Sequence, residues 1–164
     1  MEHFTYIAYG SNLLTARLRQ RIGDFEVLGV VKLEGWRIHY NKIGADGSGK
    51  CSLDSVPGET SWGVAYRFSP TAKKVLDEIE GVGNGYETVD VCDEQFGQCY
   101  LYLAASDHID RSLAPYSWYQ TLVVEGAKEY GLPDEHVSHL KGIKSVKDKN
   151  LARERANLKQ LGRG

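Results

Sequence analysis

The pattern of hydrophobic and polar positions predicts a domain in which strands outnumber helices. Strand-like stretches, alternating in polarity or rich in β-branched and aromatic residues, fall at 5–9, 25–31, 35–40, 51–56, 62–68, 86–92 and 99–104. Helical spacing falls at 14–22, 70–80, 118–130 and 133–143. Because tight turns join many of the strands, we expect an α+β fold, a mainly antiparallel β-barrel with flanking helices.

The helix at 70–80 has well-marked ends. Ser69 is placed to cap it, Pro70 suits its first position, and Gly81 is typical of a helix end. Its buried face is expected to comprise Val75, Leu76 and Ile79.

Turn residues and the distribution of charge predict where one strand ends and where the domain gives way to a tail. Pro57-Gly58 predicts a turn that ends a strand. From Lys144 onward charge is dense and apolar residues are sparse, which is typical of a loosely packed tail. We therefore expect a domain at 1–143 and a charged C-terminal tail at 144–164, partly helical or disordered.

The composition of the chain argues against nucleic acid and membrane as binding partners. A chain of 164 residues suits one domain, and its net charge of -2 gives no electrostatic case for nucleic acid. The start, Met1-Glu2-His3, lacks a basic region followed by an apolar run, and no stretch is apolar enough to span a bilayer. We expect a cytoplasmic protein with neither nucleic acid nor membrane as partner.

Cysteine and histidine patterns do not signal a metal site. The 3 cysteines include no C-x-x-C pair, so neither a zinc site nor a disulfide framework is indicated. Cys92 and Cys99 are expected to be reduced strand residues. His136 and His139 are three residues apart on a predicted helix but lack a third ligand, so we expect them on the solvated surface.

The stretch Thr5–Leu13 is a candidate binding loop. It predicts a strand, a polar turn and a helix start, with Gly10 at the bend and Ser11 or Asn12 as the helix cap. Unpaired N–H groups and the positive end of the helix dipole would attract a carboxylate or phosphate there. The plain alternative, a turn and a cap, is at least equally compatible with the local sequence. Ser11 lacks glycines on both sides, which disfavours a nucleophilic serine.

Glu80 is the candidate general base. It lies with Asp77 and Glu78 at the negative end of a predicted helix, where a carboxyl group holds its proton more readily. Glu80 follows Ile79 and precedes a glycine-rich turn, so it can point inward, whereas Asp77 and Glu78 are expected to point to water. From the local sequence alone, an exposed surface acid is the better reading.

Tyrosines are the other unusual feature, since the chain has 10 of them. Four lie at or beside the ends of predicted elements: Tyr9, Tyr86, Tyr102 and Tyr119. A tyrosine gives a cavity an apolar wall with a hydroxyl at its tip, although each one alone is equally explained by core packing.

Together these stretches resemble a known family. Tyr6–Leu13 is similar to the YGSN signature of the gamma-glutamylcyclotransferases, and Leu76–Val82 followed by Gly85-Tyr86 is similar to their acidic motif. The resemblance covers about 6–143. Further matches in the same order are Trp62-Gly63-Val64 and 126–133.

The resemblance implies a gamma-glutamylcyclotransferase-like β-barrel and an enzyme of the acyltransferase or lyase type in glutathione metabolism. Such an enzyme needs neither cofactor nor metal and releases 5-oxoproline from a small-molecule gamma-glutamyl substrate. A homodimer is one candidate assembly. By analogy Glu80 is the catalytic acid/base. The substrate-binding residues would be Tyr6, Ile7, Ala8, Tyr9, Gly10, Ser11, Asn12, Leu13, Tyr86, Tyr102 and Tyr119.

Three alternatives stay open. The leaving group could be that of a gamma-glutamylamine or a gamma-glutamylated metabolite instead of an amino acid. The same anion pocket would also suit a non-catalytic module that binds a small carboxylate, although such a module gains nothing from an acid beside its ligand. Third, the protein could be an interaction protein that binds its partner through the C-terminal tail.

The loop at 107–115 is expected to border the cavity.

Overall fold

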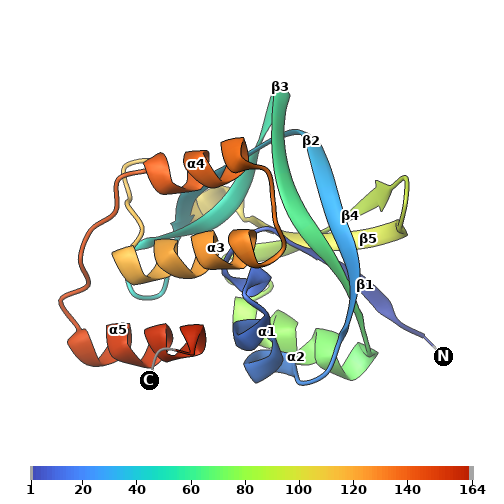
Figure 1. Ribbon diagram of the computed structural model, residues 1–164, viewed down its shortest axis with the longest axis horizontal. Helices are drawn as coiled ribbons and strands as arrows, with labels where there is room; N and C mark the ends of the chain where they lie inside the picture. The colour runs from blue at the N-terminus through green and yellow to red at the C-terminus, as the bar shows by residue number, and fades with distance from the viewer. Residues whose placement is uncertain (1, 163–164) are drawn as a thin grey trace.

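The computed structural model describes residues 2–162 and consists of one five-stranded sheet with helices packed around it (Figure 1). The strands are β1 (Phe4–Ala8), β2 (Glu26–Ile43), β3 (Gly49–Phe68), β4 (Tyr86–Asp93) and β5 (Gly97–Ala104). The α-helices are α1 (Thr15–Ile22), α2 (Pro70–Glu80), α3 (Ser117–Glu129), α4 (Asp134–Gly142) and α5 (Leu151–Leu158). Three short 3₁₀ helices are η1 (Ser11–Leu13), η2 (Ser106–His108) and η3 (Lys159–Leu161).

The sheet has the strand order β2-β3-β1-β5-β4. Its neighbours pair in an antiparallel manner except β1 and β5, which are parallel. The α+β class is therefore confirmed. In the described part of the chain β2 and β4 are edge strands with one neighbour each, so the predicted closed barrel is not confirmed.

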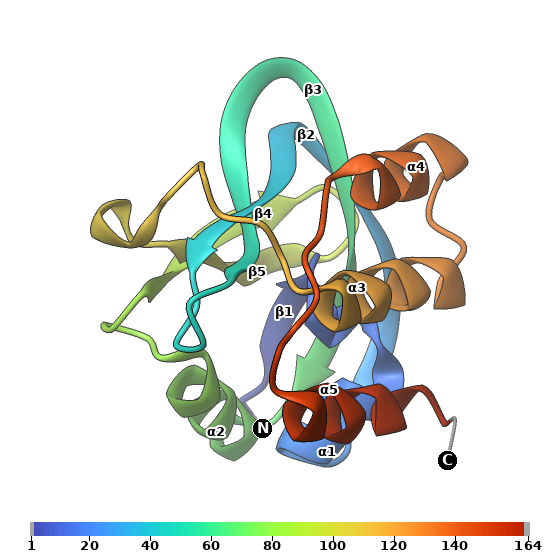
Figure 2. The ribbon, with the colours of Figure 1, turned by 90° about the vertical axis from the view of Figure 1, so that its left-hand side faces the viewer.

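β2 and β3 form one long arched hairpin instead of the shorter strands that the sequence predicts (Figure 2). The predicted turn at Pro57-Gly58 is wrong, because both residues lie inside β3. The pairing passes from Glu34–Thr60 to Trp36–Ser55, which leaves 56–59 without cross-strand partners. Proline, which has no N–H, is tolerated where the ladder is interrupted.

α2 begins and ends as predicted but buries a different face. The Ser69 hydroxyl accepts the Ala72 N–H at 3.1 Å, and Gly81 ends the helix at φ +76°. The predicted burial of Val75 and Ile79 is wrong, since they are 37% and 45% exposed. The inward stripe contains Ala72 and Leu76, and a further step of four residues reaches Glu80. This periodicity turns Glu80 toward the interior.

The C-terminal segment packs against the body through a buried carboxylate. Asp148 is fully buried and accepts hydrogen bonds from Trp118 Nε1 at 2.9 Å and Arg153 Nε at 2.6 Å. The Arg153 guanidinium holds the pKa of this carboxyl well below its usual range. α5 contacts α3, and η3 contacts α1. The division into 1–143 and 144–164 stays a prediction, and its ends at residues 1 and 163–164 lie outside the described residues.

Within residues 2–162, no helix has both the length and the apolar character needed to cross a membrane. The cytoplasmic location stays a prediction. Cys51, Cys92 and Cys99 are all free thiols, as the sequence led us to expect.

The prediction that His136 and His139 lie on the solvated surface is wrong. His136 is 5% exposed, and its Nε2 has no partner in the described chain. His139 lies between two groups of β2, with Nε2 at 2.8 Å from the Ile38 carbonyl oxygen and Nδ1 at 2.9 Å from Arg37 Nη2. α4 therefore turns this side toward β2, which its own sequence does not reveal.

The buried imidazole of His136 predicts a loss of stability in acid. Burial lowers its pKa to about 4, whereas the unfolded chain takes up this proton at about pH 6.5. Since the folded state binds fewer protons in this window, the contribution to stability is complete above about pH 6.5 and is lost as the pH falls toward 4. We expect the urea midpoint to fall less from pH 7 to pH 5 in His136→Leu than in the wild type. The exposed His3→Gln serves as control, and parallel profiles for wild type and His136→Leu would refute this account.

Candidate active site

A small cavity lies at the end of β1, where η1, the start of β3, α2 and β5 meet. Its volume is about 30 Å³, room for about one water molecule. It is lined by Tyr6, Tyr9, Gly10, Ser11, Asn12, Cys51, Glu80, Tyr86, Tyr102 and Tyr119. The structure thus brings the candidate base, the turn and all four singled-out tyrosines to one place.

Three residues of the expected binding set do not line this cavity. Ile7, Ala8 and Leu13 are at most 1% exposed and belong to the hydrophobic core. Their side chains anchor β1 and η1 in the hydrophobic core and so hold the backbone of the site in place.

Ser11 and Asn12 do not cap the first helix, contrary to the prediction. α1 begins at Thr15, and its N-cap residue Leu14 makes no side-chain bond. The Ser11 hydroxyl instead accepts a hydrogen bond from Arg17 Nε at 3.1 Å. The reason is the intervening 3₁₀ turn, which separates the polar pair from the helix start, so that both side chains bond to residues around the site instead.

The turn approaches β3 very closely. A Cβ on Gly10 would lie 2.9 Å from the Cβ of Cys51, so only glycine fits without a shift. Within residues 2–162, the backbone N–H groups of Gly10, Ser11 and Asn12 find no hydrogen-bond acceptor. Such free donors beside a cavity suit an anionic group.

Glu80 is held by one of its two carboxylate oxygens. Its Oε1 accepts hydrogen bonds from Asn12 Nδ2 at 2.9 Å and from Arg21 Nη1 at 2.8 Å. Its Oε2 receives no hydrogen bond from the described chain, and the side chain is 14% exposed. The carboxylate is therefore oriented while one oxygen stays available for a proton.

Sequence reasoning missed Arg21. At the C-terminal end of α2 the helix dipole opposes a negative charge at Glu80. Arg21 comes from the last turn of α1 and supplies a positive partner that offsets this effect. Its spacing along α1 carries no signal of the contact, because the contact depends on how α1 and α2 pack.

Asp77 was expected to point to water, but its carboxylate is bonded to two other side chains. Its Oδ1 accepts the hydroxyl of Tyr102 at 2.6 Å, and its Oδ2 pairs with Lys73 Nζ at 2.7 Å. Asp77 is three residues before Glu80, so both face the same side of α2. Glu78 is exposed, as expected. Asp77 thus orients a tyrosine that lines the cavity.

The tyrosine hydroxyls are tied to the surrounding backbone. Tyr86 donates to the Cys51 carbonyl at 2.6 Å, Tyr119 accepts the Cys51 N–H at 3.1 Å, and the Tyr9 hydroxyl donates to the Tyr102 carbonyl. Burial raises the pKa of Tyr9, Tyr86 and Tyr119 well above the ordinary value, so all three stay neutral. The cavity wall is therefore rigid and apolar, with neutral hydroxyl groups.

Cys51 lines the cavity but lacks the character of a nucleophile. Burial raises the pKa of its thiol to about 12, so the thiolate is scarce at neutral pH. Its backbone, held by two tyrosines, is the part that shapes the site.

The small cavity adjoins a wider hollow of about 400 Å³. Four residues line both spaces: Ser11, Glu80, Tyr86 and Tyr119. The wider hollow carries four basic side chains, Arg17, Arg21, Lys42 and Lys50, and also Asp46. The loop at 107–115 lines neither space, contrary to the expectation that it borders the cavity.

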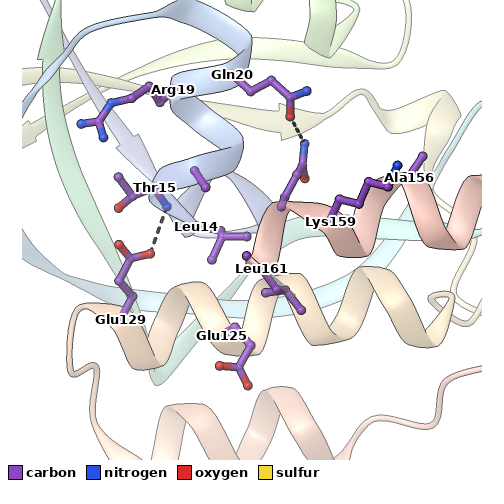
Figure 3. A pocket seen from close by; sticks show the side chains of 12 residues that line it. Leu14, Thr15, Arg19, Gln20, Glu125, Glu129, Ala156, Lys159 and Leu161 are labelled. Carbon is purple, nitrogen blue, oxygen red and sulfur yellow. Dashed lines mark hydrogen bonds between the residues drawn. The ribbon is translucent and has the colours of Figure 1, made fainter. Parts of the chain in front are cut away.

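A larger hollow of about 870 Å³ lies away from Glu80, between α1, α3 and the C-terminal segment (Figure 3). Glu129 accepts the Thr15 N–H at 3.0 Å, and Gln160 donates to Gln20 at 2.6 Å. The remaining charged side chains, Arg19, Glu125 and Lys159, lie apart from one another in the view. This hollow gathers no converging set of reactive groups.

Comparison with known proteins identifies the family of this chain. The AIG2-like family model matches residues 60–140. Human gamma-glutamylcyclotransferase is 33% identical over 152 residues, which cover 87% of this chain and 79% of that protein. The chain belongs to the gamma-glutamylcyclotransferase family. The mouse gamma-glutamylcyclotransferase is 32% identical over the same shares.

Solved structures extend the likeness of this gamma-glutamylcyclotransferase family member to the whole fold. A structure of an uncharacterized human protein superposes with a TM-score of 0.83 at 28% identity, covering 97% of this chain and 99% of that one. A gamma-glutamyl cyclotransferase structure superposes with a TM-score of 0.79 at 27% identity, covering 94% and 99%. The family resemblance that the sequence motifs indicated is thereby confirmed.

Proposed function

We propose that the protein is a gamma-glutamylcyclotransferase-type enzyme that releases 5-oxoproline from a gamma-glutamyl amino acid. The observation that carries this proposal is the setting of Glu80: one oxygen is anchored by Asn12 and Arg21, and the other is free at the edge of a tyrosine-lined cavity. Such an enzyme, of the acyltransferase or lyase type, would serve glutathione metabolism. The homodimer stays a prediction.

Binding begins at the turn after β1. The α-carboxylate of the substrate accepts hydrogen bonds from the free N–H groups of Gly10, Ser11 and Asn12. Because the inner cavity of about 30 Å³ is smaller than a glutamyl group, the substrate also fills the adjoining part of the wider hollow. Its γ-carbonyl then lies beside Glu80, which borders both spaces.

The chemistry needs one proton carrier and no protein nucleophile. Glu80 Oε2 takes a proton from the α-ammonium of the substrate, and the freed amine attacks the γ-carbonyl carbon. A C–N bond closes the five-membered ring. The bond to the leaving nitrogen breaks as Glu80 returns the proton to it. Glu80 then carries the second excess proton from the ring nitrogen to the freed amine, which departs as an ammonium ion. The attack is intramolecular in the free substrate as well, so the site contributes by holding the folded conformer in which the amine faces the γ-carbonyl.

Two groups support Glu80 in this cycle. Arg21 keeps the carboxylate oriented through the 2.8 Å bond to Oε1. Neutral tyrosine hydroxyls at the cavity wall are suitable hydrogen-bond donors for the oxygen of the tetrahedral intermediate. The Tyr6 and Tyr119 hydroxyls accept hydrogen bonds from Asn12 Nδ2 and the Cys51 N–H, so their own protons are available for this role.

A 5-oxoproline release assay tests the proposal. We would offer the purified full chain several gamma-glutamyl amino acids and gamma-glutamylamines and quantify 5-oxoproline together with the freed amine. We expect equimolar release of both from at least one gamma-glutamyl amino acid. Binding without release, seen as a thermal shift with unaltered substrate, would instead support a small-carboxylate-binding module.

A further inference from the structure

The wider hollow contains a lysine whose charge no carboxylate neutralises. Arg21 pairs with Glu80, and Lys50 pairs with Asp46 at 2.8 Å. The Lys42 ammonium, by contrast, makes neither an ion pair nor a hydrogen bond within residues 2–162, and the carboxylates of Glu80 and Asp46 favour its charge only from beyond hydrogen-bonding distance.

Lys42 is confined although it is unpaired. The residue is 8% exposed, and its Nζ lies 4.5 Å from the centre of the Tyr86 ring. A Cβ on Gly85 would lie 3.0 Å from Nζ, so glycine leaves the room that the ammonium occupies. Burial lowers the pKa of Lys42. A charged group that is largely withdrawn from water without a partner is costly, and an anionic ligand would offset that cost.

The strand register places a second lysine opposite this one. Lys42 of β2 is directly opposite Lys50 of β3, and both side chains line the wider hollow. The pairing of β2 with β3 is irregular between His39 and Lys42, as at a β-bulge; such irregularities re-aim side chains. Lys50 has Asp46 to offset its charge, whereas Lys42 has no such partner among the described residues. An anionic ligand in this hollow would supply the direct partner that the Lys42 ammonium lacks within residues 2–162.

The position of Lys42 matches the departing half of the substrate. In the proposed reaction the glutamyl half extends from the inner cavity to Glu80, which marks the bond that breaks, and the leaving group lies farther into the wider hollow. Glu80 and Tyr86 line both spaces, and the Lys42 ammonium lies over Tyr86 on the side of the wider hollow. A leaving group therefore enters the hollow close to Lys42.

We propose that Lys42 is a specificity-determining residue, whose ammonium binds a carboxylate carried by the leaving amine. This assignment rests on the proposed function. Arg17, fixed by Ser11, Asn157 and Gln160, adds positive potential to the same hollow. Recognition by charge would distinguish an amino-acid leaving group from an amine that lacks the carboxylate.

A matched pair of substrates isolates this contact. Gamma-glutamylalanine and gamma-glutamylethylamine differ only in the leaving-group carboxylate. In Lys42→Met we expect kcat/KM for gamma-glutamylalanine to fall about 10- to 100-fold, the range for losing one hydrogen bond to a charged group. We expect kcat/KM for gamma-glutamylethylamine to change less than about twofold, because that substrate makes no such bond. Lys42→Arg should restore part of the preference.

Lys32→Met is the control for net charge, because Lys32 is on the same strand with its side chain 52% exposed. An equal fall on both substrates in Lys42→Met, or no fall on either, would overturn the assignment. The wild type gives a second test that needs no variant: its kcat/KM should favour gamma-glutamylalanine, and added salt should weaken that preference. A wild-type preference for the amine would refute the role of Lys42 while leaving the proposed function intact. A wild type that releases 5-oxoproline from neither substrate nor any other gamma-glutamyl compound would refute both.

Discussion

Glu80→Gln is expected to lower kcat about 100- to 10,000-fold, the range that a positioned acid/base group contributes. The amide has the shape of the carboxylate, and its oxygen can still accept the hydrogen bonds of Asn12 and Arg21. It cannot take up the proton of the substrate's α-ammonium. Because the shape and both hydrogen bonds are kept, we expect the variant to fold, with a thermal midpoint somewhat below that of the wild type, since Arg21 loses its charged partner.

The experiment compares initial rates of 5-oxoproline release at saturating substrate for wild type, Glu80→Gln and Glu78→Gln. Glu78 is the matched control, since it is on the same helix turn, carries the same charge and is exposed. Glu78→Gln should retain the wild-type rate. Near-normal turnover by a folded Glu80→Gln protein would show that another group moves the proton.

Gly126→Ala is expected to destabilise the protein by about 1–3 kcal/mol, the usual cost of overpacking a tight contact. Gly126 is in α3, where the helix packs on η1. A Cβ there would lie 2.6 Å from the Leu14 nitrogen and 2.7 Å from the Leu13 Cβ. Because the closest atom belongs to the backbone, the 3₁₀ turn itself must move. We therefore also expect the KM to rise, since Ser11 and Asn12 belong to that turn.

Gly142→Ala provides the matched control. Gly142 is the last residue of α4, and an added Cβ would meet nothing within 4 Å. This substitution should be neutral or stabilise the protein by about 0.4–1 kcal/mol through the unfolded chain. Urea unfolding and steady-state kinetics on all three proteins check both effects. If Gly126→Ala matched Gly142→Ala in stability and KM, the close packing of α3 on η1 would not support the turn as argued.

Local chemistry along the chain was sufficient to predict the elements whose ends are set by their own residues. Ser69, Pro70 and Gly81 marked α2 correctly, because a cap, a fixed φ and a left-handed glycine act within one turn of the backbone. The helices predicted from their spacing at 118–130 and 133–143 are observed within one residue at each end. The ordered motifs around Tyr9-Gly10 and Glu80 were enough to indicate the family.

Contacts between distant segments required the tertiary structure. Arg21 reaches Glu80 across 59 residues, and Tyr102 reaches Asp77 across 25, so neither pair leaves a local pattern. The depth of His136 and the exposure of Val75 and Ile79 depend on which neighbour covers each helix face, which spacing alone does not specify.

The same physical reason explains the sheet and the site. The merging of the predicted strands into β2 and β3 depends on cross-strand pairing that tolerates an irregularity at 56–59. The sequence determined which residues have the chemistry for proton transfer and anion binding. Only the packing of α1 and α2 and the course of β2, β3 and β5 placed Glu80, Arg21 and Lys42 around one pair of adjoining spaces, because such proximity arises from contacts far apart in the chain.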